Sequence, residues 1–205
     1  MSFATLASND LLEKTITSLK DKGYTVHTVK TKEEALSVLV SAIPDNASVM
    51  NGSSVTLEQI GFIDLLKSDK HTWNNLHAAI VTETDLDKKT HLRKQALLAD
   101  YYVGSVHALA SNGDYLVASN TGSQLPHIVN SSKNLVFVVS TRKIVENEKD
   151  MFIRLTEYVV PLEDKHMQEL YNVHTTLNKI VISKGESPLG GRSVTFILVD
   201  TELGF

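Results

Sequence analysis

Helix-like and strand-like spacings of apolar residues alternate along this chain, and this alternation restricts the fold more than any other feature. Residues 11–19 have the three- and four-residue spacing of an amphipathic helix, whereas residues 24–29 alternate as a strand does. Residues 31–43 are again helical, begin with a capping box and are followed by Pro44. Strands that alternate with helices predict an α/β protein with a mostly parallel sheet flanked by helices.

The same alternation continues to the end of the chain. Residues 135–139 form the most apolar run, and we expect a central strand there because both faces of such a strand are buried. Further strands are predicted at 47–50, 78–81, 100–103, 115–118, 179–182 and 194–199, and further helices at 56–66, 84–99, 121–130 and 151–159. Without a repeat or a Pro/Gly-rich linker, one domain over residues 1–205 is the simplest account, with an N-terminal helical segment at about 1–22.

Composition excludes several classes of function. The net charge is −4 at pH 7, and no basic stripe predicts binding to nucleic acid or to an anionic membrane. The chain has no cysteine, so it holds no disulfide, thiolate nucleophile or cysteine-ligated iron–sulfur cluster. Its histidines lack metal-binding spacing, and no cofactor or metal is assigned. Neither a signal peptide nor a membrane span is visible, which predicts a cytoplasmic protein.

A loop of small, hydroxyl-bearing residues follows the predicted strand at 47–50. Glycine lets the backbone approach a ligand, and N–H groups at a helix start favour a phosphate or a carboxylate. The candidate ligand-binding residues in this loop are Gly52, Ser53, Ser54 and Thr56. The alternative is a plain helix start, with Thr56 as N-cap and Gln59 completing a capping box.

Two later loops repeat this chemistry after the predicted strands at 100–103 and 115–118. The candidate ligand-binding residues here are Ser105, Asn120, Thr121, Gly122 and Ser123. Ligands of parallel sheets bind beyond the carboxyl ends of strands, so we expect these loops to share one pocket with the first. Turns and helix caps without a ligand are the alternative.

Two residues near these loops could handle protons. His107 could act as an acid or a base near neutral pH, or could be a hydrogen-bonded structural histidine. Glu58 could be a catalytic carboxylate, or could only favour the helix start that it occupies. Arg142 and Lys143 follow the central strand and could meet an anion, or could simply be surface charges.

Three stretches of the sequence resemble the LUD domain family, whose lactate-utilisation members include LutC-like proteins. They are the loop at 51–61, the block at 97–144 with its Lys143-Ile144-Val145 step, and residues 191–205 with their Leu-Gly-Phe ending. The resemblance implies a fold of the NagB/RpiA/CoA-transferase-like group. The family matches fall on Gly52, Ser53, Thr56, Glu58, Ser105, Ala108, Gly113, Thr121 and Gly122.

The resemblance implies a function in organic-acid metabolism. It implies a LutC-like protein that binds a small anionic metabolite in the strand-end pocket, with iron–sulfur, lactate-oxidising proteins as possible partners. Many relatives carry an arginine where this chain has Gln124, and some carry a cysteine cluster that residues 160–190 lack. The alternative is an isomerase or CoA-transferase-like enzyme acting on a sugar phosphate or an acyl-CoA. A homodimer is expected from base rates alone.

Overall fold

The computed structural model describes residues 3–205, which contain a six-stranded sheet whose strands all run parallel. Its strands, in spatial order, are β1 (Thr25–Val29), β10 (Ser193–Val199), β7 (Asn134–Ser140), β4 (Tyr101–Gly104), β2 (Ser48–Asn51) and β3 (Asn74–Asn75). The run at 135–139 is therefore central, as its apolar character predicts. The α/β class and the mostly parallel sheet flanked by helices are confirmed.

A second, mixed sheet of four strands lies against the first. Its order is β8 (Ile144–Val145), β5 (Ala108–Ala110), β6 (Tyr115–Ser119) and β9 (Lys179–Ser183). Two of its strands, β6 and β9, occur where the sequence predicts strands, and they pair antiparallel with each other. The other two, β5 and β8, are not anticipated because runs of three and two residues are too short for a periodic pattern.

Helices cover both sheets. They are α1 (Asn9–Asp21), α2 (Lys32–Ser41), α3 (Val55–Gln59), α4 (Phe62–Leu66), α5 (Leu76–Thr82), α6 (Leu86–Ala96), α7 (Glu148–Arg154) and α8 (Val160–Tyr171). A π-helical turn at Leu155–Val159 joins the last two, a second π-helical turn lies at His127–Ser131, and 3₁₀ turns lie at Thr141–Lys143 and Pro188–Gly190. The N-terminal helix lies inside the predicted segment at 1–22, whose first two residues fall outside the described part.

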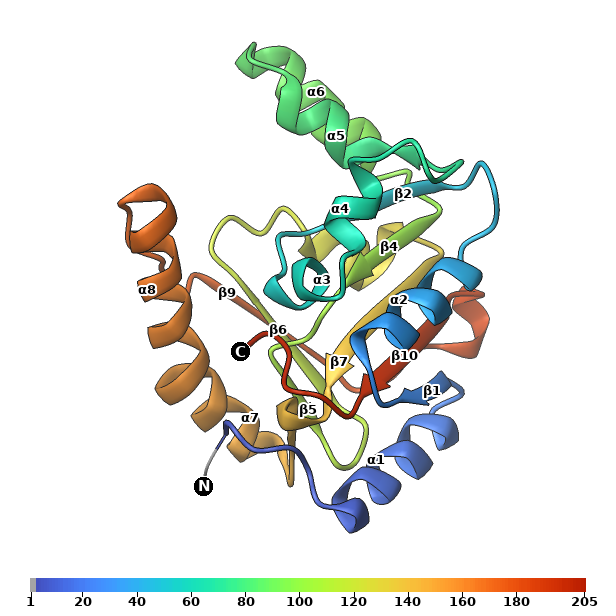
Figure 1. Ribbon diagram of the computed structural model, residues 1–205, viewed down its shortest axis with the longest axis vertical. Coiled ribbons are helices and arrows are strands. Elements are labelled where there is room, and N and C mark those ends of the chain that lie inside the picture. The colour runs from blue at the N-terminus through green and yellow to red at the C-terminus, as the bar shows by residue number, and fades with distance from the viewer. Residues whose placement is uncertain (1–2) are drawn as a thin grey trace.

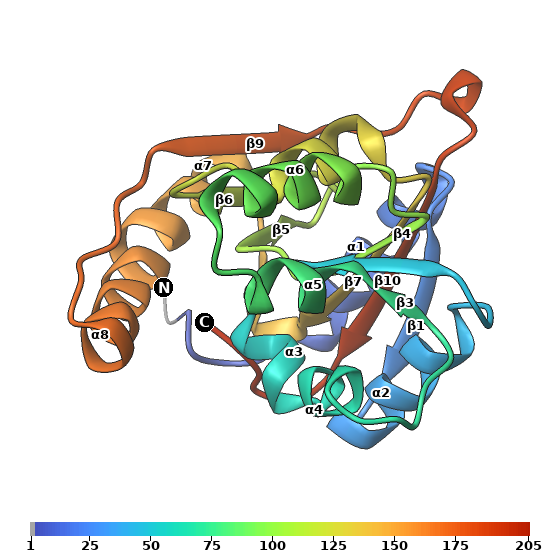
Figure 2. The ribbon, with the colours of Figure 1, turned by 90° about the horizontal axis from the view of Figure 1, so that it is seen from above.

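Strand alternation sorts the apolar side chains into separate packing layers. In β7, Val136 and Val138 face α2, α3 and α4, whereas Leu135, Phe137 and Val139 face α1 and the second sheet. The opposite face of the second sheet packs against α7 and the π-helical turn after it. Figure 2 shows α2 and α4 on one side of the molecule, with β9 and α7 on the other.

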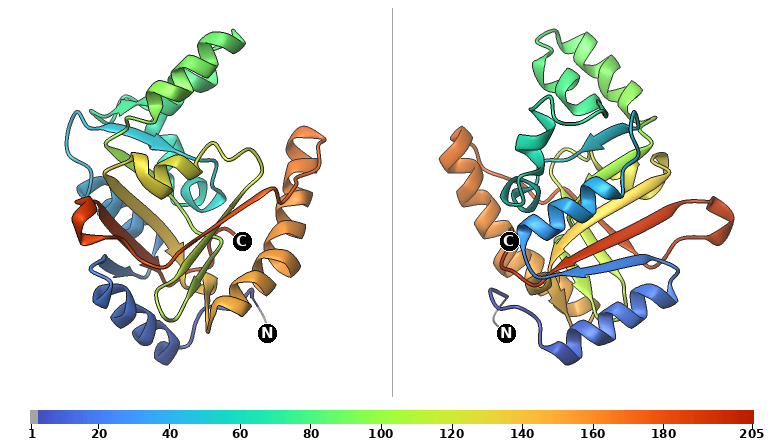
Figure 3. Two further views of the ribbon diagram at one scale, coloured as in Figure 1. Left: turned by 180° about the vertical axis from the view of Figure 1, so that it is seen from behind. Right: turned by 45° about the vertical axis from the view of Figure 1, so that its right-hand side comes forward.

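Two helical arms stand out from these layers. The α5–α6 pair extends from the end of the six-stranded sheet that carries β2, at the top of Figure 1, and α8 extends along the left side of that view. Seen from behind, β9 passes from the end of α8 across the molecule towards the turn before β10 (Figure 3). The C-terminus lies between α8 and α3 in Figures 1 and 2.

Two local predictions are wrong. The strand predicted at 78–81 is part of α5, which begins where the Asn75 side chain accepts a hydrogen bond from the Ala78 N–H at 3.1 Å. A short run of Ala, Ile and Val fits a helix as well as a strand, so the capping residue decides. The N-cap of α3 is Ser54, which accepts from the Leu57 N–H at 3.3 Å, and not Thr56.

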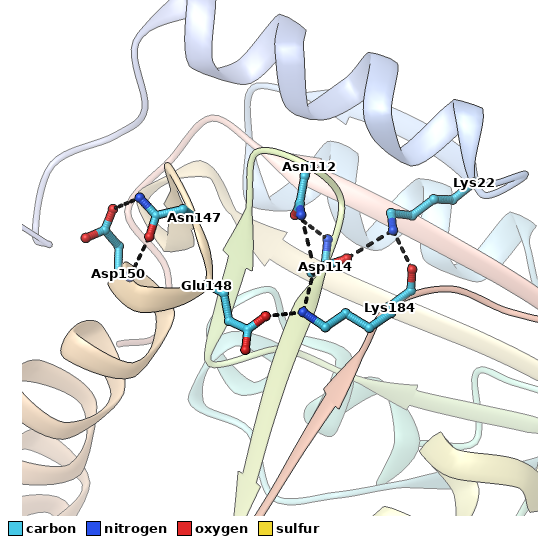
Figure 4. A network of polar contacts seen from close by, with 7 residues as sticks. All are labelled: Lys22, Asn112, Asp114, Asn147, Glu148, Asp150 and Lys184. Carbon is cyan, nitrogen blue, oxygen red and sulfur yellow. Dashed lines mark hydrogen bonds and ion pairs between the residues drawn. The ribbon is translucent and has the colours of Figure 1, made fainter.

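Ion pairs between side chains connect the end of α1, the β5–β6 turn, the end of β9 and the start of α7 (Figure 4). The carboxylate of Asp114 accepts from Lys22 and from Lys184, both at 3.0 Å. Lys184 also pairs with Glu148 at the start of α7. The Asp114 side chain is only 5% exposed, and both lysines lower its pKa against the opposing effect of burial. We call these four residues the Asp114 network.

The single tryptophan of the chain belongs to the layer between the six-stranded sheet and α2–α4. Trp73 is buried, packs at a tilted angle against Phe62 and stacks on His71 with ring centroids 5.3 Å apart. Its indole N–H donates to the Ile43 carbonyl at 3.4 Å. This packing fixes the loop between α4 and α5 against the core.

Candidate anion-binding cavity

A cavity of about 810 Å³ lies beyond the carboxyl ends of β2, β4 and β7. The loops after β2, β4 and β6 line it, and α6, α8 and the C-terminal residues complete its walls. Strands that run parallel release the chain at the same edge of the sheet, which is why loops far apart in sequence meet here.

Most of the predicted ligand-binding residues meet at this cavity. Those that line it are Gly52, Ser53, Ser54, Thr56, Ser105, Asn120, Thr121 and Ser123. Gly122 is outside the lining: its φ of 82° shapes the turn, and its N–H donates to the Ser119 hydroxyl at 2.9 Å. Whether these residues bind a ligand stays a prediction.

Gly52 lets two of the loops touch. A Cβ built at this position would lie 2.5 Å from Gln124 Oε1 and 2.8 Å from the Tyr102 hydroxyl oxygen. Gln124 in turn donates to the Ala118 carbonyl at 3.1 Å, so it supports the start of its own loop. Gln124, which stands where many relatives have an arginine, therefore lies where the loops after β2 and β6 meet.

A buried lysine lies at the bottom of the cavity. Lys143 is 3% exposed, and its Nζ donates to Thr56 Oγ1 at 3.0 Å and to Ser105 Oγ at 3.1 Å. It comes from the 3₁₀ turn after β7, whereas Thr56 lies in the first turn of α3 and Ser105 follows β4. Lys143 thus joins three strand ends at one amine.

Two arginines lie behind this lysine. Arg154 is fully buried and donates from Nη1 to the His107 carbonyl, while Arg142 Nη2 donates to the Tyr158 hydroxyl at 3.0 Å. Arg154 Nε and Nη2 and Arg142 Nε are buried without a hydrogen-bond partner. We call Lys143, Arg142 and Arg154 the basic cluster.

The basic cluster has no acidic counterpart in the described chain. Across residues 3–205, no Asp or Glu forms an ion pair with any of its three members. Burial, followed by the charges of Arg154 and Arg142, holds the pKa of Lys143 well below its usual value. Burial and Arg142 also lower the pKa of Arg154, to about 10. The inner end of the cavity is therefore electropositive.

The positive potential has a different source from the one the sequence suggests. Helix α3 after the first loop has only five residues, Val55–Gln59, so its dipole contributes little. Thr56 accepts from Lys143 instead of capping this helix. Arg154 is absent from the sequence-based candidates because an arginine in an apolar helical stretch gives no sign that it is buried.

His107 lines the cavity beside Lys143. Its Nδ1 accepts from the Ala118 N–H at 3.1 Å, which leaves the proton on Nε2. Burial, with the charges of Lys143 and Arg154, lowers the pKa of this imidazole to about 3. At neutral pH it is therefore an uncharged hydrogen-bond donor and a weak base. Its predicted role in proton transfer stays a prediction.

Glu58 lies outside the lining of this cavity. It is exposed and borders a separate surface groove between α2 and α4. The carboxylate that does line the cavity is Glu163 of α8, whose pKa is raised by burial and, less strongly, by Glu58. Sequence reasoning missed Glu163 because nothing in the amphipathic pattern of α8 distinguishes it.

The outer wall of the cavity carries further positive charge. Lys89, Arg93 and Lys94 project from α6, one of the two helical arms, and line the cavity. Glu163 and His166 line it from the other arm, α8. Within residues 3–205 no group of three His, Asp or Glu side chains could hold a metal ion, and no helix has the length and hydropathy to cross a membrane.

The fold and this cavity define an α/β protein with an electropositive pocket at the carboxyl edge of its parallel sheet. The chain belongs to the LUD domain family, whose model matches residues 12–188. Among solved structures, it is similar to a DUF162 family protein from Deinococcus radiodurans, with a TM-score of 0.58 and 10% sequence identity. That match covers 97% of this chain and 98% of the other, and at this identity it supports the fold alone. No curated protein sequence matches the chain.

Proposed function

We propose that this chain is a LutC-like protein of lactate utilisation that binds a small carboxylate-bearing metabolite in the cavity. The observation that carries the proposal is the basic cluster without an acidic partner. Removing a cation from water costs several kcal/mol unless an opposite charge compensates it, as a general magnitude. A bound anion would supply the compensation that the described residues do not.

The ligand would be held by groups of two kinds. Arg142 and Arg154 attract the carboxylate from behind Lys143, whose amine lines the cavity. Hydroxyls of Ser53, Ser105 and the loop after β6 supply neutral hydrogen bonds around it. This division fits a ligand with one charged end and a short polar body.

Calorimetric titration of the purified chain with lactate, pyruvate and inorganic phosphate tests the proposal. Saturating ligand should raise the free energy of unfolding, by about 2.7 kcal/mol at one hundred times Kd. Arg154→Met should abolish binding by removing part of the positive potential. Lys149→Met, which removes an equal charge from an exposed site, is the matched control. Equal binding by both variants would refute the proposal.

A second candidate is an enzyme acting on a sugar phosphate or an acyl-CoA. The observation that favours it is the row of Lys89, Arg93 and Lys94 on α6, since a carboxylate at Lys143 would leave these charges unused. Coenzyme A and ribose 5-phosphate should then bind more tightly than lactate. The double variant Arg93→Ala/Lys94→Ala should weaken them selectively.

The proposed partners are iron–sulfur, lactate-oxidising proteins, and a homodimer is the proposed assembly. Size-exclusion chromatography with light scattering tests the dimer. Reconstitution with an iron–sulfur lactate-oxidising protein tests the complex, whose formation should alter co-elution. A chain that elutes alone and as a monomer would refute both.

A further inference from the structure

The amine of Lys143 has the geometry of a nucleophile and not only that of an anion ligand. An uncharged amine has two hydrogens and one lone pair. The two hydrogens are accounted for by the bonds to Thr56 Oγ1 at 3.0 Å and Ser105 Oγ at 3.1 Å. The lone pair is then left without a partner on an amine that lines the cavity.

The surroundings of this amine favour its uncharged form. Among the described residues no carboxylate pairs with it, its hydrogen-bond partners are neutral hydroxyls, and Arg154 and Arg142 add like charge. His107 beside it is uncharged at neutral pH. Burial next to another cation is a known way to make a lysine amine reactive towards a carbonyl group.

We propose that Lys143 forms an imine with the carbonyl group of a 2-oxo acid bound in the cavity. The proposal rests on the proposed function, since the acid must first be held as an anion. The amine nitrogen attacks the carbonyl carbon and a carbinolamine forms. Both amine hydrogens then leave with the former carbonyl oxygen as water, and a carbon–nitrogen double bond remains. No oxidant or other reactant is needed.

The arrangement around Lys143 selects a carbonyl next to a carboxylate. Once the amine carries the carbonyl carbon, a carboxylate on the adjacent carbon lies within the positive potential of Arg154 and Arg142. The Nε2 of His107, which lines the cavity beside Lys143, is a donor available to it. A 2-hydroxy acid would occupy the same place without reacting, because it has no carbonyl group.

Reductive trapping tests this directly. The intact chain is incubated at pH 7 with isotopically labelled pyruvate and sodium cyanoborohydride, which reduces an imine to a stable secondary amine. Peptide mass mapping should place the label on Lys143 as the dominant site. Lys143→Arg keeps a basic side chain at this position but has no amine, and should lose this label completely. Lys149→Arg, at an exposed lysine, should leave the label on Lys143 unchanged.

Calorimetry with lactate and pyruvate separates the two proposals. Binding of both acids without any label on Lys143 would overturn the imine and leave the proposed function intact. Absence of binding and of label would overturn both. Labelling spread evenly over surface lysines, equal in wild type and Lys143→Arg, would also overturn the imine. Circular dichroism of each variant confirms that the fold is retained.

Discussion

The Asp114 network and the basic cluster are both groups of charged residues that join distant segments, yet their charges are arranged in opposite ways. In the Asp114 network two lysines, Lys22 and Lys184, face the carboxylates of Asp114 and Glu148. In the basic cluster three basic side chains face hydroxyls, a carbonyl and the ring of Tyr158, and no carboxylate of the described residues pairs with them. The first arrangement is complete in itself and supports the fold. The second gains its counter-charge only from a ligand.

We expect the largest change in stability from a substitution in the Asp114 network. Asp114→Ala removes the carboxylate that compensates two lysines, and should lower the free energy of unfolding by about 2 kcal/mol, less than for a fully buried pair because the lysines can regain water. Urea denaturation measures the change. Glu146→Ala, in an exposed pair with Lys14 at 3.6 Å, should change stability by no more than about 0.5 kcal/mol. Equal effects would contradict the structural role of the network.

The next effect concerns the tail that lies on the basic cluster. Gly204 has a φ of 61°, and a Cβ there would lie 2.3 Å from Thr56 Oγ1 and 2.9 Å from Lys143 Nζ. Gly204→Ala should cost about 1–2 kcal/mol and weaken anion binding as the tail moves away. Gly190→Ala meets no atom within 4 Å and is the control for thermal unfolding and titration. Unchanged binding in Gly204→Ala would show that the tail is not part of the pocket.

For the basic cluster, we expect a substitution to change the free energy of unfolding in the opposite direction. Lys143→Met keeps the volume and removes an amine that burial and two neighbouring arginines force towards its uncharged form, so the ligand-free chain should gain about 1 kcal/mol. Urea denaturation of this variant beside Lys149→Met gives the comparison. A clear loss of stability would mean that the bonds to Thr56 and Ser105 outweigh the cost of burying Lys143.

The smallest expected effect is a pH dependence of the stability difference between Lys143→Met and the wild type. The pKa of Lys143 is well below its ordinary value of 10.5 in the folded chain. At a pH between the folded-state pKa and 10.5, the unfolded chain therefore binds a proton that the folded chain does not. Stability contributed by this group rises with pH through that window. The gap between Lys143→Met and the wild type should therefore shrink as the pH is raised from 7 towards 10. A constant gap would contradict the lowered pKa.

Low pH should lower the stability that the Asp114 network contributes. The pKa of Asp114 is lowered from 3.8 in the folded chain, so its contribution is complete above that value and is lost as the pH falls below it. The wild type and Asp114→Ala should therefore converge in stability at low pH. Urea denaturation across the acid range checks this, and a constant difference would argue against the paired carboxylate.

The sequence predicts the order of the main elements because long apolar periodicities leave few choices. The parallel sheet and the meeting of its strand-end loops follow from that order. Periodicity cannot find β5 and β8, which are shorter than its window, and it mistakes residues 78–81 of α5 for a strand. The strands β5 and β8 depend on pairing partners from elsewhere in the fold, whereas α5 depends on its capping residue Asn75.

The sequence predicts where the cavity lies, but not which buried side chains give it positive charge. Ser and Gly loops at strand ends indicate where a ligand can enter, because strand polarity is a local property. Whether Arg154 is buried or solvated depends on which sheet its helix covers, and nothing in its neighbours specifies that. The same limit hides the exposure of Glu58, since its helix position fits either a pocket wall or the surface.

The position of Trp73 determines what fluorescence can report. The indole packs between α2–α4 and the six-stranded sheet, away from the residues that line the cavity. Its emission should thus follow global unfolding with little change on ligand binding. Since the chain has no other tryptophan, the intrinsic signal offers a baseline for stability in the presence of any metabolite. Binding itself will need an introduced probe, and a cysteine-free chain accepts a single thiol label at Thr121 without competing sites.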